Sequence, residues 1–270
     1  MTTSNTEIKR IARENLTGNY RVPMMAMVLS YLITSTIQSI FQTRVEESQS
    51  TGAYIAYFLA SVIAMVLSSV FALGISQIHL NLARGKEVHT GMIFHGFRQA
   101  NRYVPAAAIL CGMEMVLSIP LGYGTYEFLR YFNASDPFDA DNLKAICIFV
   151  GGWLVSMILL YLLQLVFGMF FYVVLDYPDM TIGQCMKGAV VGLKGNRGAL
   201  LGLFLSFLGM GILGLLSFGL GFLWVGPYYE QSVALFYLDS KHELSKLEEE
   251  KKQKKTEEKA GPGPTFEHYV

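Results

Sequence analysis

Two acidic residues stand where the surrounding sequence is almost wholly apolar. Glu114 lies near the middle of the apolar segment 103–122, and Glu230 lies near the middle of the segment 219–238. A carboxylate at membrane depth costs at least ~2.5–3.5 kcal/mol and is expected to face other helices or a wet cavity. No lysine or arginine lies at that depth. We therefore expect both groups to be protonated and hydrogen-bonded to a group such as Gln164, or to bind a cation. The alternative is a neutral structural hydrogen bond that holds helices together.

The residues around Glu230 read GFLWVGPYYEQSVALFY from Gly221. Proline removes a backbone donor, so Gly226 and Pro227 predict a kink or break in this segment. Tyr228 and Tyr229 then supply groups that could satisfy freed carbonyls or a bound solute. Broken helices with polar groups at mid-depth form the sites of many transporters, although proline kinks also occur without transport. The candidate midplane polar site is Glu114, Gln164, Tyr228, Tyr229 and Glu230.

These residues belong to a chain with the composition of a membrane protein. Of its 270 residues 52% are hydrophobic and only 16% are charged, and the mean hydropathy is +0.38. A helix needs about 20 mostly apolar residues to cross ~30 Å of hydrocarbon, since only a helix satisfies its own backbone without water. Six segments meet this requirement, and the predicted fold is all-α with six transmembrane helices. They lie near residues 22–43, 54–81, 103–122, 146–175, 198–217 and 219–238.

The distribution of positive charge predicts how these helices are oriented. With both termini cytoplasmic, the outer loops hold only Arg44, Arg130 and Lys144 of the 21 lysines and arginines. Basic residues on the cytoplasmic side are the usual determinant of membrane topology. Basic residues in the inner segments and acidic residues in the outer loops favour a plasma membrane. This distribution of charge also argues against a nucleic-acid partner. Residues 1–21 have no apolar core of a signal peptide, so the first span is expected to direct insertion.

A short repeat divides the apolar region into three units. Asn19, Asn101 and Asn196 each precede an apolar run and each has an arginine close behind. Upstream of each lies a candidate amphipathic helix, whose apolar stripes are Ile8, Ile11, Ala12 and Leu16; Ile93, Phe94 and Phe97; and Ile182, Cys185, Met186, Ala189, Val190 and Leu193. The predicted unit is an amphipathic helix followed by a transmembrane hairpin. Such helices either lie in the headgroup plane or pack on the inner end of the bundle.

Other features of the sequence predict no cofactor or metal. Three isolated cysteines and five scattered histidines have no metal-ligand spacing, and no nucleotide-binding motif occurs. Gly188-xxx-Gly192 and Gly198-xxx-Gly202 permit close helix approach, either within the chain or in a homo-oligomer. We expect one membrane domain over residues 1–239 and a charged, disordered cytoplasmic tail over 240–270.

Several of these segments together resemble a bacterial membrane family, domain of unknown function 975. The resemblance covers about residues 8–240 and rests on IKRIARENLTGNYRV, LARGKEVHTGMIFHGF, VLDYPDMTIGQCMKGAVVGLKGNRG and the run ending in PYYEQSVALFY. It implies a six-helix membrane protein with no established activity. QLVFGMF at 164–170 departs from the family pattern, which has Pro-Gly there, so the resemblance does not carry a family-type break of the fourth helix over to this chain. The layout also looks like the membrane portion of some glycerophosphodiester phosphodiesterases, an analogy that hints at lipid-related work.

The leading functional hypothesis from sequence is a non-enzymatic scaffold or accessory factor in envelope or lipid homeostasis. It rests on the three amphipathic helices, with membrane lipids and a protein partner or second copy as its partners. The alternative is a small-solute or cation transporter or channel that uses the midplane polar site. A lipid-modifying enzyme is a weaker hypothesis, because no catalytic acid–base set can be assembled. The two leading hypotheses differ in whether Glu114 and Glu230 share one cavity.

Overall fold

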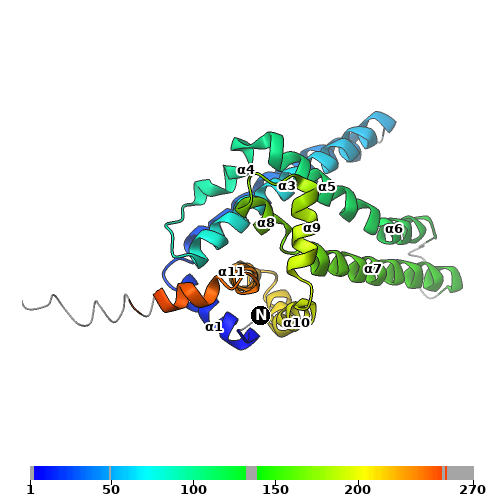
Figure 1. Ribbon diagram of the computed structural model, residues 1–270. Helices are drawn as coiled ribbons and strands as arrows, with labels where there is room; N and C mark the ends of the chain where they lie inside the picture. Colours follow the sequence, from blue (N-terminus) through cyan, green and yellow to red (C-terminus); the bar gives the residue numbers. More distant parts are fainter. Residues whose placement is uncertain (1–2, 49, 132–138, 251–252, 254–270) are drawn as a thin grey trace, which may run out of the picture.

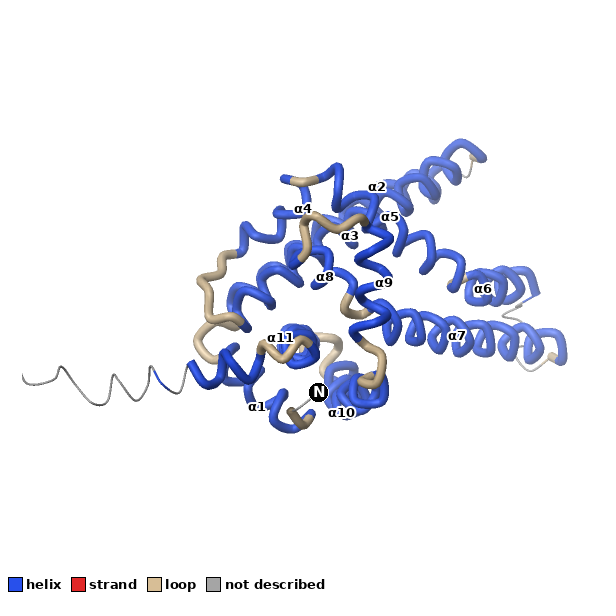
Figure 2. Tube along the Cα trace, viewed as in Figure 1, coloured by secondary structure: helices blue, strands red, loops and turns tan. Residues whose placement is uncertain are grey.

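The computed structural model describes residues 3–48, 50–131, 139–250 and 253, and the helices account for nearly all of them (Figures 1 and 2). No strand occurs among these residues, in agreement with the predicted all-α class. The helices are α1 (Asn5–Leu16), α2 (Arg21–Ser48), α3 (Thr51–Ala83), the 3-10 helix η1 (Thr90–Phe94), α4 (His95–Arg98), α5 (Ala100–Leu117), α6 (Ile119–Tyr131), α7 (Ala140–Phe167), α8 (Phe170–Asp176), α9 (Ile182–Gly192), α10 (Arg197–Leu216) and α11 (Phe222–Ser240).

Four of these helices are long and apolar enough to cross a membrane. They are α2, α3, α7 over Ala140–Gln164, and α10, and the bent pair α5–α6 adds a fifth if it forms one span. The two halves of that pair meet at 47°. Large apolar side chains are exposed along these helices, as lipid-facing surfaces require. The length and composition of these helices therefore identify the chain as a membrane protein. The predicted number of spans was six, which is more than the four or five that meet these criteria.

Helix α11 differs from the others because protein covers most of its length, although Phe222 and Trp224 near its start are exposed. All residues from Gln231 to Asp239 are buried, and α11 packs against α1, α2, α3 and α10. In Figure 1, α2–α3 and α6–α7 extend away from the centre of the molecule in different directions, and α10 and α11 are seen along their axes. A helix buried all round can carry polar side chains that other helices satisfy, which lowers its hydropathy.

The two ends of the helical region lie together. The backbone N–H and Oγ1 of Thr3 donate to the carboxylate of Asp239, at 3.4 and 2.6 Å. We call this end of the molecule the base; it also holds Arg84 after α3 and Asp176 at the end of α8. Residues 244–250 form a further helical segment there, anchored by buried Leu244. The rest of the predicted tail, apart from Gln253, lies outside the described residues.

The connecting helices use their apolar stripes inside the protein. Ser4 caps α1 by accepting the N–H of Glu7, and the predicted stripe of α1 is fully buried. In α9, Thr181 and Gln184 form a capping box, and Cys185 and Ala189 are buried. The second predicted helix is instead a 3-10 turn and a single α turn, in which Ile93 is buried but Phe94 and Phe97 are exposed.

The repeat turns at Asn19 and Asn196 have the same structure. Each asparagine N–H donates to the carbonyl of a buried leucine three residues earlier, at 2.8 and 3.0 Å. Gly18 and Gly195 precede them with φ of +84° and +87°, which glycine adopts without a steric penalty. Asn101 was expected to form the third such turn, but it is the second residue of α5. Alanine precedes it in place of glycine, so the left-handed turn is missing.

Two expected positions of helix breaks can be compared with the structure. The fourth apolar segment does break, since α7 ends at Phe167 and α8 begins at Phe170, with Gly168 between them. At Gly226 and Pro227, where a kink or a break was predicted, there is no break, because α11 continues through both residues. Pro227 leaves only the carbonyl of Leu223 without its helical donor, and Leu223 lies in the first turn, so the helix loses one bond near its end.

The closest backbone-to-backbone approaches between elements occur at glycines other than those with the predicted spacing. A Cβ at Gly74 of α3 would lie 2.7 Å from the carbonyl carbon and Cα of Ile93, so η1 rests directly on α3. Gly152 of α7 makes a similar approach to the backbone of α6 at Pro120. Of the glycines with the predicted spacing, Gly202 and Gly188 approach side chains, since an added Cβ would lie 3.2 Å from Asn5 Nδ2 and 3.4 Å from Val173 Cγ1. At Gly192 and Gly198 an added Cβ would meet nothing within 4 Å. The glycine positions that matter for packing are thus set by which face of each helix meets a neighbour.

Candidate functional site

One cavity of the described chain lies where α3, α5, α7, α8 and α11 meet. Its volume is about 330 Å³, and Met27 of α2 completes its wall. Small-molecule sites in proteins span about 300–1,000 Å³, so this cavity has room for a small solute. We call it the glutamate cavity, because Glu114 and Glu230 both line it.

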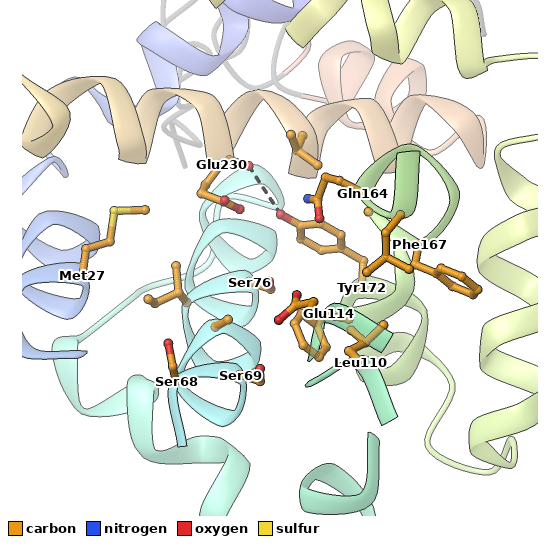
Figure 3. A pocket seen from close by; sticks show the side chains of 16 residues that line it. Met27, Ser68, Ser69, Ser76, Leu110, Glu114, Gln164, Phe167, Tyr172 and Glu230 are labelled. Atoms are coloured by element: carbon orange, nitrogen blue, oxygen red, sulfur yellow. Dashed lines mark hydrogen bonds between the residues drawn. The ribbon is translucent and has the colours of Figure 1, made fainter. Parts of the chain in front are cut away.

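The two glutamates reach the cavity from different helices. Glu114 comes from the last turn of α5, and Glu230 from the middle of α11. Figure 3 shows their carboxyl groups projecting into the same space, with Gln164 of α7 at its edge. Gln164 is exposed, so the cavity reaches the surface of the chain beside α7. The structure therefore brings together three of the five residues predicted for the midplane site.

Tyr228 and Tyr229 lie outside the glutamate cavity. The Tyr228 hydroxyl donates to the backbone carbonyl of Lys9 in α1, at 3.2 Å, and its ring meets Phe207 edge-on. Tyr229 packs edge-on against Phe204 and Phe207 of α10. Neighbours in sequence point about 100° apart on a helix, so residues next to Glu230 do not share its face.

Helix α3 contributes a polar stripe that sequence reasoning missed. Ser68, Ser69 and Ser76 line the cavity together with Ala72 and Ile75. Their spacing follows one face of a helix, and this recurrence of small and polar residues in SSVFALGIS was the available signal. Ser69 Oγ also shares a hydrogen bond of 3.0 Å with Cys111 Sγ of α5. These hydroxyls give the cavity several neutral oxygen atoms beside its two carboxyl groups.

The break between α7 and α8 admits Tyr172 to the cavity wall. Its hydroxyl donates to the backbone carbonyl of Glu230 at 3.4 Å, and its side chain is fully buried (Figure 3). A buried tyrosine normally has a partner for its hydroxyl. Because this partner is the backbone of α11 at Glu230, Tyr172 fixes α8 against the helix that carries the glutamate.

None of the residues that line the cavity is a lysine, arginine or histidine. Two carboxyl groups thus share a partly enclosed space with serine, glutamine and tyrosine groups and without a basic partner. Such a set favours either protons on the carboxyl groups or a bound cation that supplies the missing charge. Hard cations prefer oxygen ligands of this kind. Among the described residues, no group of three or more histidine, cysteine, aspartate or glutamate side chains could hold a metal ion.

A second polar group lies at the base and was not predicted. Arg84 donates to both oxygens of Asp176 at 2.8 Å and to both oxygens of Glu243, at 2.8 and 3.1 Å. Lys241 donates to Asp176 at 2.8 Å. We call Arg84, Asp176, Lys241 and Glu243 the ionic cluster. It joins the ends of α3, α8 and α11, elements far apart in the sequence.

The ionic cluster controls the charge of Asp176. Burial alone would disfavour its ionised form, but hydrogen bonds from Arg84, Lys241 and Tyr237 outweigh this effect and lower its pKa to about 2. Burial opposes the charged form of Lys241, but its contact with Asp176 raises the pKa of Lys241. Asp176 and Lys241 are therefore both charged at neutral pH, as paired charges with little solvent exposure must be.

The fold and the cavity define the class: a helical membrane protein with a buried carboxyl-lined cavity. Comparison with known families adds a name to that class. The family described as "Protein of unknown function (DUF975)" matches residues 1–243, and the chain belongs to it. This match confirms the resemblance drawn from the sequence motifs. Neither the curated proteins nor the solved structures include a match to this chain.

Proposed function

We propose that this chain is a non-enzymatic, six-span membrane transporter or channel for a small cation or a small cationic solute. The observation that carries the proposal is that Glu114 and Glu230 line one cavity that has no basic residue in its wall. A cation entering this cavity would neutralise two carboxylates that are otherwise costly at membrane depth. The serine hydroxyls and Gln164 would supply neutral ligands as the solute loses water.

The position of the chain ends supports six crossings. Thr3 and Asp239 are hydrogen-bonded, so both ends of the helical region lie at the base. Ends on one side of a membrane require an even number of crossings. Four long spans and the bent α5–α6 pair make five, and α11 supplies the sixth. The excess of basic residues in the segments at the base supports a cytoplasmic position for it, at the plasma membrane and with both termini inside.

The scaffold hypothesis has less support from the packing. It depended on apolar stripes that would lie in the headgroup region, but Ile8, Ile11 and Leu16 of α1 and Leu193 after α9 are buried by protein. Their surface is no longer available to lipid or to a partner. Exposed Phe94 and Phe97 remain as candidate contacts with lipid in the second unit. The shared cavity of the glutamates therefore favours transport over a scaffold role.

The test is cation flux in proteoliposomes. We would impose gradients of protons, sodium, potassium and magnesium, and compare the parent with a Glu114→Gln, Glu230→Gln double variant that is still monodisperse. We expect flux of at least one cation in the parent and the protein-free rate in the double variant. Glu46→Gln, the same chemical change at an exposed site on α2, is the matched control and should behave as the parent.

Two results would contradict the proposal. The first is an unchanged flux in the double variant, because a carboxyl-dependent site would then have no role in passage. The second is no flux of any tested cation in the parent, which would return the glutamates to a structural role and the chain to the scaffold hypothesis.

A further inference from the structure

Two stacked tyrosines separate the glutamate cavity from the base. Tyr172 lines the cavity, and its ring lies 5.3 Å from that of Tyr237, with only 21° between their planes. Their exposed fractions are 1% and 2%. Neighbouring Phe236 and His79 are completely buried as well. No opening therefore runs from the cavity past this pair to the base in the described chain.

The ionic cluster holds the inner tyrosine in place. The Tyr237 hydroxyl donates to Oδ2 of Asp176 at 2.8 Å, and Lys241 donates to the same oxygen. Arg84 makes a bidentate contact with Asp176 from the end of α3. The stack and the cluster thus form one continuous structure, from the cavity wall to the surface of the base.

Part of this structure comes from the chain beyond α11. Lys241 and Glu243 follow the last residue of that helix, and Leu244, which is 2% exposed, anchors them. Charged side chains of the cluster are 10–29% exposed, so water reaches their edge. Ion pairs in that position can separate and reform, because water can hydrate the freed charges. Charges sealed in an apolar interior could not be hydrated in this way.

We infer that the Tyr172–Tyr237 stack and the ionic cluster form a gate that closes the glutamate cavity toward the base, with the segment after α11 as its latch. This inference rests on the proposed function, since a transport site must be closed on one side at a time. Displacing residues 241–244 removes Lys241 and Glu243 from the cluster and frees Tyr237 to leave the stack. The start of the tail thereby regulates access to the cavity.

The test measures access to the cavity and not transport. Cys111, Cys147 and Cys185 are replaced by alanine or serine, and Ser69→Cys places a single reporter thiol in the cavity wall. A positively charged methanethiosulfonate reagent, which does not cross lipid, is added to inside-out and right-side-out membrane vesicles. The labelling rate is followed by mass spectrometry. Labelling from the base side should be slow in the reporter chain.

Opening the gate should accelerate that labelling. Tyr237→Ala removes the stack, and Arg84→Gln removes the bidentate contact with Asp176. Because a hydrogen bond to a charged group shifts an equilibrium about tenfold or more, each variant should raise the base-side rate by about that factor. Tyr237→Phe keeps the stack and loses only the bond to Asp176, so it should have a smaller effect. Labelling from the opposite side should not change.

Arg44→Gln is the control for loss of an ion pair elsewhere, since Arg44 pairs with Glu47 at 3.6 Å on the exposed end of α2. The inference would be overturned if the reporter chain with an unaltered gate were labelled rapidly from the base side. It would also be overturned if Arg84→Gln and Arg44→Gln gave equal base-side labelling rates. If Tyr237→Ala does not fold, Tyr237→Phe and Arg84→Gln decide the question. Because no transported solute is involved, accelerated labelling without cation flux would refute the proposed function and leave the gate intact.

Discussion

Adding one methyl group at Gly74 should destabilise the protein, although alanine is normally the better helix residue. The new Cβ would lie 2.7 Å from the carbonyl carbon and Cα of Ile93, and closer still to its carbonyl oxygen. Carbon atoms pack best at about 3.5–4.0 Å, so η1 would have to move away from α3 by about 1 Å. The obstructing atoms belong to the backbone, and no side-chain rotation can relieve the overlap.

That movement would disturb a buried cluster. Ile93 and Ile78 are completely buried, and they pack with Phe71 and Ala26. Overpacking costs about 1–3 kcal/mol, and we expect Gly74→Ala to reach the upper end of that range, about 3 kcal/mol. At about 2–4 °C per kcal/mol, the Tm should fall by roughly 6–12 °C.

Thermal unfolding of the purified protein in detergent measures this effect. Gly52→Ala is the matched control in the same helix, because its nearest neighbour, Ser50 Oγ, would be 4.0 Å from the new Cβ. Helix propensity favours alanine over glycine by about 0.8–1.0 kcal/mol, so this control should be neutral or stabilising. Ile93→Ala should not rescue Gly74→Ala, since the contact is with the backbone. An unchanged or higher Tm for Gly74→Ala would refute the described contact of η1 with α3.

Three further outcomes are expected. Gly96→Ala places a Cβ 2.6 Å from Val70 Cγ1, so it should lower the Tm, and Val70→Ala in the same chain should recover part of the loss. Ile8→Glu buries a carboxylate and should lower the free energy of unfolding by at least about 3 kcal/mol, whereas exposed Arg13→Glu in the same helix should change it by about 0.5 kcal/mol or less. Asp176 has a pKa near 2, lowered from 3.8, so its stabilising effect is complete above about pH 4 and disappears as the pH falls toward 2. Thermal unfolding across this pH range should therefore show the difference between parent and Asp176→Asn shrinking with acidification.

Local signals in the sequence predicted local structure well. The apolar stripe ending at Leu16 predicted α1, because a 3.6-residue period specifies a helix without help from distant residues. The glycine before Asn19 and Asn196 likewise determined both turns. At Asn101 the same motif failed, since the conformation depends on the preceding glycine and not on the asparagine.

Contacts between distant segments were harder to predict. Arg84 and Asp176 are 92 residues apart, and no periodicity reveals which helix ends meet. The convergence of Glu114 and Glu230 could be stated only as a question, because it depends on how α5 and α11 rotate about their axes. Tyr228 and Tyr229 were assigned to the site because they are close to Glu230 in sequence. Successive residues of a helix point about 100° apart, so closeness in sequence does not show that side chains share a face.

The central place of α11 has a consequence for biosynthesis. Translation delivers this helix after α1 to α10, yet α1, α2, α3 and α10 pack against it. Until it emerges, the earlier helices can enter the membrane, but α1 and α10 lack the helix with which each makes its most extensive contact. The cavity wall then lacks Glu230, and the core of the molecule lacks its longest continuous buried segment. A ribosome that stops before residue 222 would release helices with exposed interior surfaces, a substrate for quality-control proteases, so maturation of this protein depends on the arrival of α11.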